Sequence, residues 1–154
     1  METNAQSAHD NDQQAATGIR YRVGLDVGST TVKAVVIQAG IGEAEIGCIL
    51  WHDYQRHDTR QPEKLLELLH CMEAEIGIAP GNCRMFITGS GGNALSALIG
   101  AKFVQEVNAV ALAVEKLHPE VNSVIELGGQ DAKIIIFKED GGNGRRKKIP
   151  SMND

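Results

Sequence analysis

The chain has 154 residues, of which 42% are hydrophobic and 23% are charged, and its formal net charge is −5. That length supports one domain with a sizeable core and leaves little room for two independent domains. The acidic balance gives no general attraction to nucleic acid or anionic lipid, and no apolar run approaches the roughly 18 residues of a membrane span. The sequence therefore predicts a cytoplasmic protein with no nucleic-acid or membrane partner.

The first third of the chain predicts a polar tail and a three-stranded antiparallel unit. Residues 1–18 are polar and predict a disordered tail. Residues 21–27 and 31–38 are rich in β-branched side chains and are separated by Gly-Ser-Thr, which predicts a hairpin. Residues 44–51 supply a third strand, and the polar stretch 52–58 predicts a connection.

The middle of the chain predicts helices that alternate with short strands. Apolar residues recur at helical spacing from Pro62 to Ile76, with the proline in the first turn, which predicts an amphipathic helix. Further along, the pattern predicts a strand at 84–88, a helix at 93–99, a strand at 103–107 and a helix capped by Asn108 that runs to about Leu117.

The last part predicts strands at 121–126, 133–138 and 147–152, the last of them starting within a basic run that reads as a solvated hairpin. The element order is thus β-β-β-α-β-α-β-α, followed by β-β. A mixed order of this kind predicts an α/β fold, with a mixed sheet flanked by helices.

Two segments of the chain share one pattern. DVGSTTVK at 26–33 and ELGGQDAK at 126–133 both read acid, apolar, Gly, small, polar, polar, apolar, Lys, with each residue of the second segment numbered 100 higher. Both lie between apolar strands. One Asp-x-Gly hairpin is most often structural, because Asp and Gly favour turns for local reasons. Agreement in order, spacing and flanking strands at two places favours a functional repeat.

The repeated pattern has the chemistry of a phosphate site. A glycine at the strand exit permits a turn whose successive N–H groups bind phosphate oxygens, and the hydroxyls of Ser29, Thr30 and Thr31 add donors. The acids at the strand ends, Asp26 and Glu126, would repel phosphate, so their expected role is to hold Mg²⁺, usually through water. Lys33 and Lys133 either neutralise phosphate or face solvent. Two such hairpins that face each other would clamp one polyphosphate.

At these residues the sequence resembles the superfamily of acetate kinases, sugar kinases, heat-shock protein 70 and actin, whose two ribonuclease-H-like domains each begin with a phosphate hairpin. It resembles the BadF/BadG/BcrA/BcrD ATPase family more closely, the activators of 2-hydroxyacyl-CoA dehydratases and aryl-CoA reductases. LDVGSTTVKAVV is similar to the first phosphate motif of that family, ITGSGGNAL to its next strand-turn-helix, VIELGGQDAKII to its second phosphate motif, and SMND to the segment before its cluster-binding cysteine.

The resemblance implies a first ribonuclease-H-like subdomain at 19–120 and the opening strands of a second at 121–154. It implies an ATPase that binds ATP or ADP with Mg²⁺ and couples hydrolysis to one-electron transfer into a dehydratase or reductase acting on an acyl-CoA. The catalytic acids would be Asp26 and Glu126. Many members of the family have Asp at the position of Glu126. The nucleotide-binding residues would be Gly28, Ser29, Thr30, Thr31, Lys33, Gly128, Gly129, Gln130, Asp131 and Lys133.

The family also implies a homodimer that shares a 4Fe-4S cluster, held by cysteine thiolates. Cys48, Cys71 and Cys83 show no metal-ligand spacing and do not match the cluster positions, and the sequence stops at Asp154, where the cysteine-bearing segment of the family would begin. We therefore expect the cluster only in a longer protein of which this chain is the amino-terminal piece, and weak or no ATPase activity from the piece alone.

Four alternatives remain open. Gly89, Gly91 and Ala94 fit the G-x-G-x-x-A dinucleotide fingerprint, although Glu106 follows too soon to be its ribose-binding acid. A sugar or carboxylate kinase would need a carboxylate base after Thr88, which the loop does not clearly offer. The histidines and aspartates at 52, 53, 57 and 58 suggest either a metal cluster or, with more weight, solvated loop residues. A non-catalytic docking module is the fourth.

Overall fold

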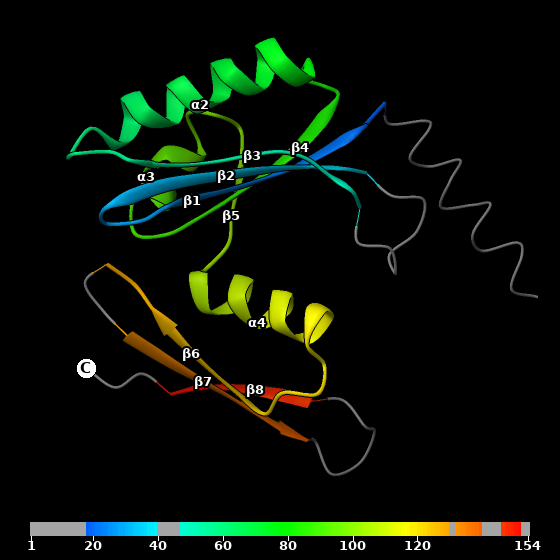
Figure 1. Ribbon diagram of the computed structural model, residues 1–154, viewed down its shortest axis with the longest axis vertical. Helices are drawn as coiled ribbons and strands as arrows, with labels where there is room; N and C mark the ends of the chain where they lie inside the picture. Colours follow the sequence, from blue (N-terminus) through cyan, green and yellow to red (C-terminus); the bar gives the residue numbers. More distant parts are fainter. Residues whose placement is uncertain (1–17, 40–46, 130–131, 140–145, 152–154) are drawn as a thin grey trace, which may run out of the picture. The chain divides into compact units, whose positions relative to one another are not determined.

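The fold is given by a computed structural model, which describes residues 18–39, 47–129, 132–139 and 146–151 (Figure 1). The predicted tail, apart from Gly18, and the predicted site residues Gln130 and Asp131 lie outside the described residues. The chain divides after Phe103 into two compact units, which are described separately.

The first unit is a five-stranded mixed sheet with the strand order β3-β2-β1-β4-β5. β1 pairs antiparallel with β2 and parallel with β4, and the other neighbours continue these directions. This arrangement is ribonuclease-H-like and confirms the predicted α/β class. The elements are β1 (Tyr21–Val27), β2 (Thr31–Gln38), β3 (Ile49–Arg56), α2 (Gln61–Ile76), β4 (Cys83–Thr88), α3 (Gly92–Ser96) and β5 (Lys102–Phe103).

The core of the first unit lies between the sheet and α2, which runs along one face of it (Figure 1). Successive side chains of a strand point to opposite faces. The buried residues of β1 accordingly alternate, and they pack with alternate residues of β2 and with one stripe of α2. The core members from these elements are Val23, Leu25, Val27, Val32, Ala34, Val36, Leu65, Leu68 and Met72.

Local chemistry sets the ends of α2. Pro62 lies in the first turn, where its missing N–H costs no helical hydrogen bond, and Glu63 complements the positive end of the helix. Gly77 ends the helix in the left-handed conformation, with φ of 74°, and its N–H donates to carbonyls of the last turn. The predicted helix is thus confirmed to within one residue of its start.

The second unit contains α4 (Glu106–Leu117) and a three-stranded antiparallel sheet of β6 (Ser123–Leu127), β7 (Ala132–Glu139) and β8 (Arg146–Ser151), in that order. Its core consists of Ala111 from α4 with Ile135 and Phe137 from β7. The strands follow the predicted ones within two residues at each end.

Four predicted elements need correction. The helix predicted at 93–99 ends at Ser96, and the strand predicted at 103–107 is the two-residue β5, because α4 already begins at Glu106. β3 does not end near residue 51 but runs from Ile49 to Arg56, so most of the supposed polar connection is an edge strand. Its residues are polar because only one side is partly covered, as where Trp51 donates to Glu75 of α2 at 3.0 Å. α4 begins at Glu106 rather than after Asn108, because Gln105 is the extended residue before the helix.

Candidate functional site

The first hairpin places an acid beside a base at the end of the sheet. Asp26 of β1 lies directly opposite Lys33 of β2, and Lys33 Nζ is 2.6 Å from Asp26 Oδ2. Because Leu25 and Val27 point into the core, Asp26 projects from the sheet face opposite α2. The paired side chains remain partly exposed, with 46% of Lys33 and 26% of Asp26 accessible.

The second hairpin has the same cross-strand register as the first. Glu126 of β6 lies opposite Lys133 of β7, as Asp26 lies opposite Lys33. Lys133 Nζ is 4.0 Å from Glu126 Oε2 and 2.8 Å from Glu106 Oε2 at the start of α4. The sequence repeat is therefore also a repeat of strand pairing. The clamp of one polyphosphate by both hairpins stays a prediction.

The turn of the first hairpin is held by its own backbone and by neighbouring elements. Gly28 N–H donates to the carbonyl of Thr31 at 2.9 Å. Thr31 is buried, Ser29 is half-buried and Thr30 is exposed at the tip. In the second turn, Gly128 and Gly129 are exposed. The predicted donors of the first turn thus lie together at one end of its sheet.

The β4–α3 loop packs closely against the first hairpin. Gly91 N–H donates to the carbonyl of Val27 at 2.9 Å. Gly89 is buried with φ of +88°, and a Cβ on it would lie 2.4 Å from the carbonyl oxygen of Val27 and 2.6 Å from Asp26 Oδ1. The glycines that suggested a dinucleotide fingerprint therefore have a packing role here, which the absence of a side chain makes possible.

Two polar atoms at this strand end are buried without a hydrogen-bond partner in the described part of the chain. They are Asp26 Oδ1 and Thr88 Oγ1, from residues that are direct neighbours in the parallel pairing of β1 and β4. Burying a carboxylate oxygen without a hydrogen-bond partner costs free energy, and a cation or a water molecule bound at the site would offset this cost. This donor set fits Mg²⁺, which is bound by one or two carboxylates together with waters and phosphate oxygens.

The β3–α2 loop supports the turn from the side of α2. His57 N–H donates to the carbonyl of Thr30 at 3.3 Å, and Gln61 Nε2 donates to the carbonyl of Gly28 at 2.9 Å. His57 is 4% exposed, so the solvated loop predicted for it is wrong. Sequence reasoning missed Gln61, whose only signal is its place before Pro62 at the start of α2.

The described residues hold no group of three His, Cys, Asp or Glu side chains arranged for a metal ion. Cys48 is exposed, whereas Cys71 lies on α2 and Cys83 begins β4. Partial burial raises the pKa of the Cys83 thiol, and its Sγ donates to the carbonyl of Ala79 at 3.6 Å. The expectation that none of these cysteines is a cluster ligand stays a prediction.

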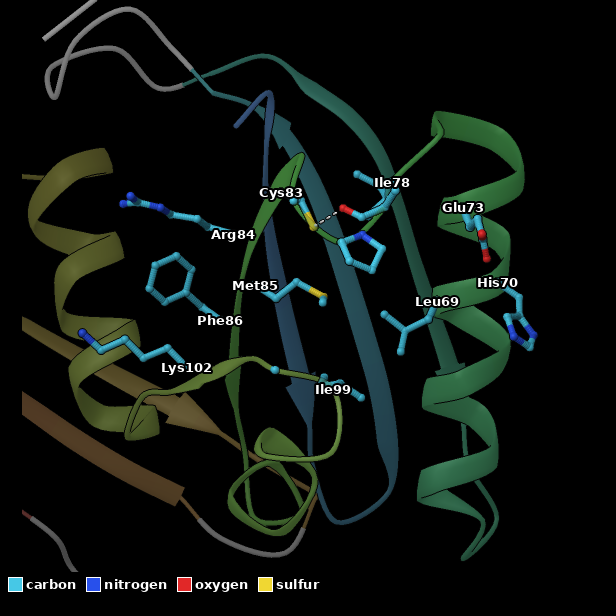
Figure 2. Close-up of a pocket in the computed structure, with 14 residues that line it drawn as sticks. Leu69, His70, Glu73, Ile78, Cys83, Arg84, Met85, Phe86, Ile99 and Lys102 are labelled. Carbon is cyan, nitrogen blue, oxygen red and sulfur yellow. Dashed lines mark hydrogen bonds between the residues drawn. The ribbon is translucent and has the colours of Figure 1, made fainter. Parts of the chain in front are cut away.

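A separate hollow of about 760 Å³ lies at the other end of β4 from Thr88. Figure 2 shows Leu69, Met85 and Ile99 around it, while Arg84, Phe86 and Lys102 project to the other side of β4. Its lining comes from α2, the connection that follows it, β4 and the segment between α3 and β5.

Comparison with known proteins identifies related sequences. A sequence model of the BadF/BadG/BcrA/BcrD ATPase family matches residues 23–149. The chain is 28% identical over 115 residues to the (R)-2-hydroxyglutaryl-CoA dehydratase activating ATPase of Acidaminococcus fermentans, a match that covers 75% of this chain and 42% of that protein. It is 30% identical over 122 residues to the 2-hydroxyisocaproyl-CoA dehydratase activator of Clostridioides difficile, covering 79% of this chain and 42% of that protein.

A solved structure agrees with these sequence matches. The activator of the 2-hydroxyisocaproyl-CoA dehydratase from Clostridium difficile, with bound ADPNP, superposes with a TM-score of 0.60 at 28% identity, over 84% of this chain and 46% of that one. The chain thus spans about 42% of the length of the curated relatives it matches. Within the described ranges, no helix has both the length and the apolar character that crossing a membrane requires.

Proposed function

The chain belongs to the BadF/BadG/BcrA/BcrD ATPase family, and on that premise we propose that it is the nucleotide-binding amino-terminal region of an ATP-dependent activase. The activase would use ATP to drive an electron into a 2-hydroxyacyl-CoA dehydratase or a related acyl-CoA enzyme. The relatives that support this proposal are a dehydratase activating ATPase and a dehydratase activator.

One observation carries the nucleotide site. Asp26 stands at the end of β1 beside a turn whose backbone carbonyls accept hydrogen bonds from neighbouring elements, and its Oδ1 is buried without a hydrogen-bond partner among the described residues. The proposed roles follow from that geometry. Asp26 would hold Mg²⁺ through water, and the turn from Gly28 to Thr31 would bind phosphate oxygens.

The second hairpin would take the same roles in nucleotide binding. Glu126 would hold the metal through water, and the turn that begins Gly128-Gly129 would bind phosphate, with Lys133 at its base. The further proposed contacts are Gln130 and Asp131. Mg²⁺ supplies charge neutralisation of the phosphates when it is bound. No cysteine of this chain is proposed as an iron–sulfur ligand, because none matches the cluster positions that the family resemblance implies.

Titration of the chain with ADP, in the presence and in the absence of Mg²⁺, tests the nucleotide site. We expect Mg²⁺-dependent binding that Asp26→Ala weakens at least about tenfold, since the variant removes the only carboxylate of the first turn. Asp53→Ala is the control, because Asp53 is a carboxylate of the same sheet that bonds Tyr54 N–H and Gln55 instead. Equal affinities of the wild type and the Asp26 variant would refute the assignment.

A further inference from the structure

The side chain of Gln61 lies where three elements of the first unit meet. Its Nε2 donates to the carbonyl of Gly28 at 2.9 Å, across 33 positions of sequence. A Cβ on Gly91 would lie 3.0 Å from Gln61 Oε1, so the glycine leaves room for this side chain. Gln61 thus contacts both the hairpin turn and the β4–α3 loop from the first residue of α2.

The hydrogen bond from Gln61 fixes the direction of one backbone amide. The described peptide bonds are trans, and in a trans peptide the C=O of one residue and the N–H of the next point in opposite directions. Since the Gly28 carbonyl is directed at Gln61, the N–H of Ser29 points away from Gln61. The orientation of this peptide is therefore set by a side chain of another element.

That direction matters because of the two faces of the sheet. Gln61 belongs to α2, which packs on the face of Leu25 and Val27, whereas Asp26 projects from the opposite face. The Ser29 N–H is therefore turned toward the face that carries the Asp26 carboxylate and its partner Lys33. We infer that Gln61 is a positioning residue of the phosphate turn, which aims the Ser29 N–H at the ligand side.

The segment that presents Gln61 has an enforced conformation. Asp58 and Thr59 both have positive φ, 47° and 67°, although neither is glycine. A positive φ is unfavourable for residues other than glycine and persists only where surrounding contacts impose it. Here Thr59 N–H donates to His57 Nδ1 at 3.1 Å, and Arg60 N–H donates to the carbonyl of His57 at 2.7 Å. The β3–α2 loop therefore holds Gln61 in one position beside the β1–β2 turn.

The inference rests on the proposed function for the identity of the ligand, a nucleoside phosphate, but not for the orientation of the peptide. Gln61→Met tests it, because Met has a similar length and lacks the amide donor. Gln55→Met is the matched control, since Gln55 also donates through Nε2 but to Asp53 Oδ2, at 2.6 Å on β3. Thermal unfolding of both variants verifies that they are folded.

Two measurements test the effect of Gln61→Met, one on the orientation of the peptide and one on nucleotide binding. In the ligand-free chain, we expect Gln61→Met to change the residual dipolar coupling of the Ser29 N–H and the carbonyl ¹³C shift of Gly28, whereas Gln55→Met leaves both unchanged. In titrations with Mg·ADP, we expect Gln61→Met to raise Kd about fivefold to tenfold, the worth of one fixed hydrogen bond. Adenosine, which has no phosphate, is the ligand whose binding should not change.

The outcomes separate the inference from the proposed function. An unchanged Ser29 coupling in folded Gln61→Met overturns the inference, whatever the nucleotide result. A changed coupling with an unchanged Kd for Mg·ADP also overturns it, because the amide would not then face the ligand. If the wild-type chain binds no Mg·ADP, the proposed function fails for this chain, and the ligand-free coupling alone decides whether Gln61 positions the turn.

Discussion

Lys33 lies directly across the hairpin from Asp26, with its Nζ 2.6 Å from Oδ2, and Lys133 holds the equivalent cross-strand place opposite Glu126. In each hairpin the acid expected to hold a metal already has a cation beside it. A Mg²⁺ ion that uses the carboxylate must therefore share it with lysine or displace the lysine. This relationship gives Lys33 a role other than facing solvent.

Replacing Lys33 with Met should change the stability of the fold little and make Mg²⁺ binding at Asp26 easier. The ion pair is substantially exposed, so we expect the free energy of unfolding to change by less than about 1 kcal/mol. Removing a competitor for Asp26 should lower the Mg²⁺ concentration that half-saturates ADP binding, by about twofold to fivefold. Calorimetric titrations at fixed ADP and varied Mg²⁺ measure this. A weaker affinity for ADP at saturating Mg²⁺ would assign Lys33 to phosphate instead.

A second prediction concerns the glycine that covers Asp26. A Cβ at Gly89 would approach the carbonyl oxygen of Val27 to 2.4 Å, where only backbone movement can relieve the contact, and φ there is +88°. We expect Gly89→Ala to destabilise the protein by about 3 kcal/mol or more and to disturb nucleotide binding with it. Urea unfolding gives the first quantity and ADP titration the second.

Gly81 supplies the matched control for this substitution. Its φ of +94° is similar, but nothing lies within 4 Å of an added Cβ. Gly81→Ala should therefore cost only the conformational strain, about 1–2 kcal/mol. Equal losses for the two variants would mean that the close approach of the β4–α3 loop to Asp26 is not important.

The sequence was sufficient for the parts of the fold that depend on local pattern. The β1–β2 hairpin and α2 were predicted within one residue because alternation, β-branched residues, a proline and a glycine mark them directly. β3 was misplaced because an edge strand with one open side has little apolar pattern. Its polar sequence resembles a loop until the pairing with β2 is known.

The residues of the candidate site likewise divide into those that the local sequence pattern predicts and those that it does not. Asp26 and the turn residues repeat in order along the chain, so the sequence predicts them as a group. Gln61 reaches the turn because α2 packs on the sheet, and Thr88 lies beside Asp26 because β4 pairs with β1. A side chain that acts across 33 positions leaves no local signal. The sequence carries no signal that Glu106 belongs to this site, because its partner Lys133 is distant in sequence.

The thiols should differ in reactivity. Burial raises the pKa of Cys83, so at a given pH a smaller fraction of that thiol is the reactive thiolate, and Cys48 is exposed. We expect iodoacetamide to modify Cys48 well before Cys83, with the rate at Cys83 still rising above about pH 8.5. Mass spectrometry of peptides from timed reactions measures both rates. Equal rates would show that the start of β4 opens readily.

The last prediction concerns Lys133, which is only 15% exposed and lies between two carboxylates. Lys133→Met would leave Glu106 and Glu126 close to each other without the intervening cation. Like charges repel and partly buried carboxylates lose a charged hydrogen bond, so we expect a loss of about 1–3 kcal/mol in the second unit. Amide hydrogen exchange in β6 and β7 locates the loss, and the first unit should keep its protection.

Lys133→Arg is the control that separates charge from shape, because arginine keeps the cation between the two acids. We expect it to restore most of the protection in β6 and β7 that Lys133→Met removes. If both variants lose protection equally, the amine is needed for its size rather than its charge. If neither does, the two acids tolerate each other, and the pairing of Lys133 with Glu106 at 2.8 Å does not hold α4 to the second hairpin.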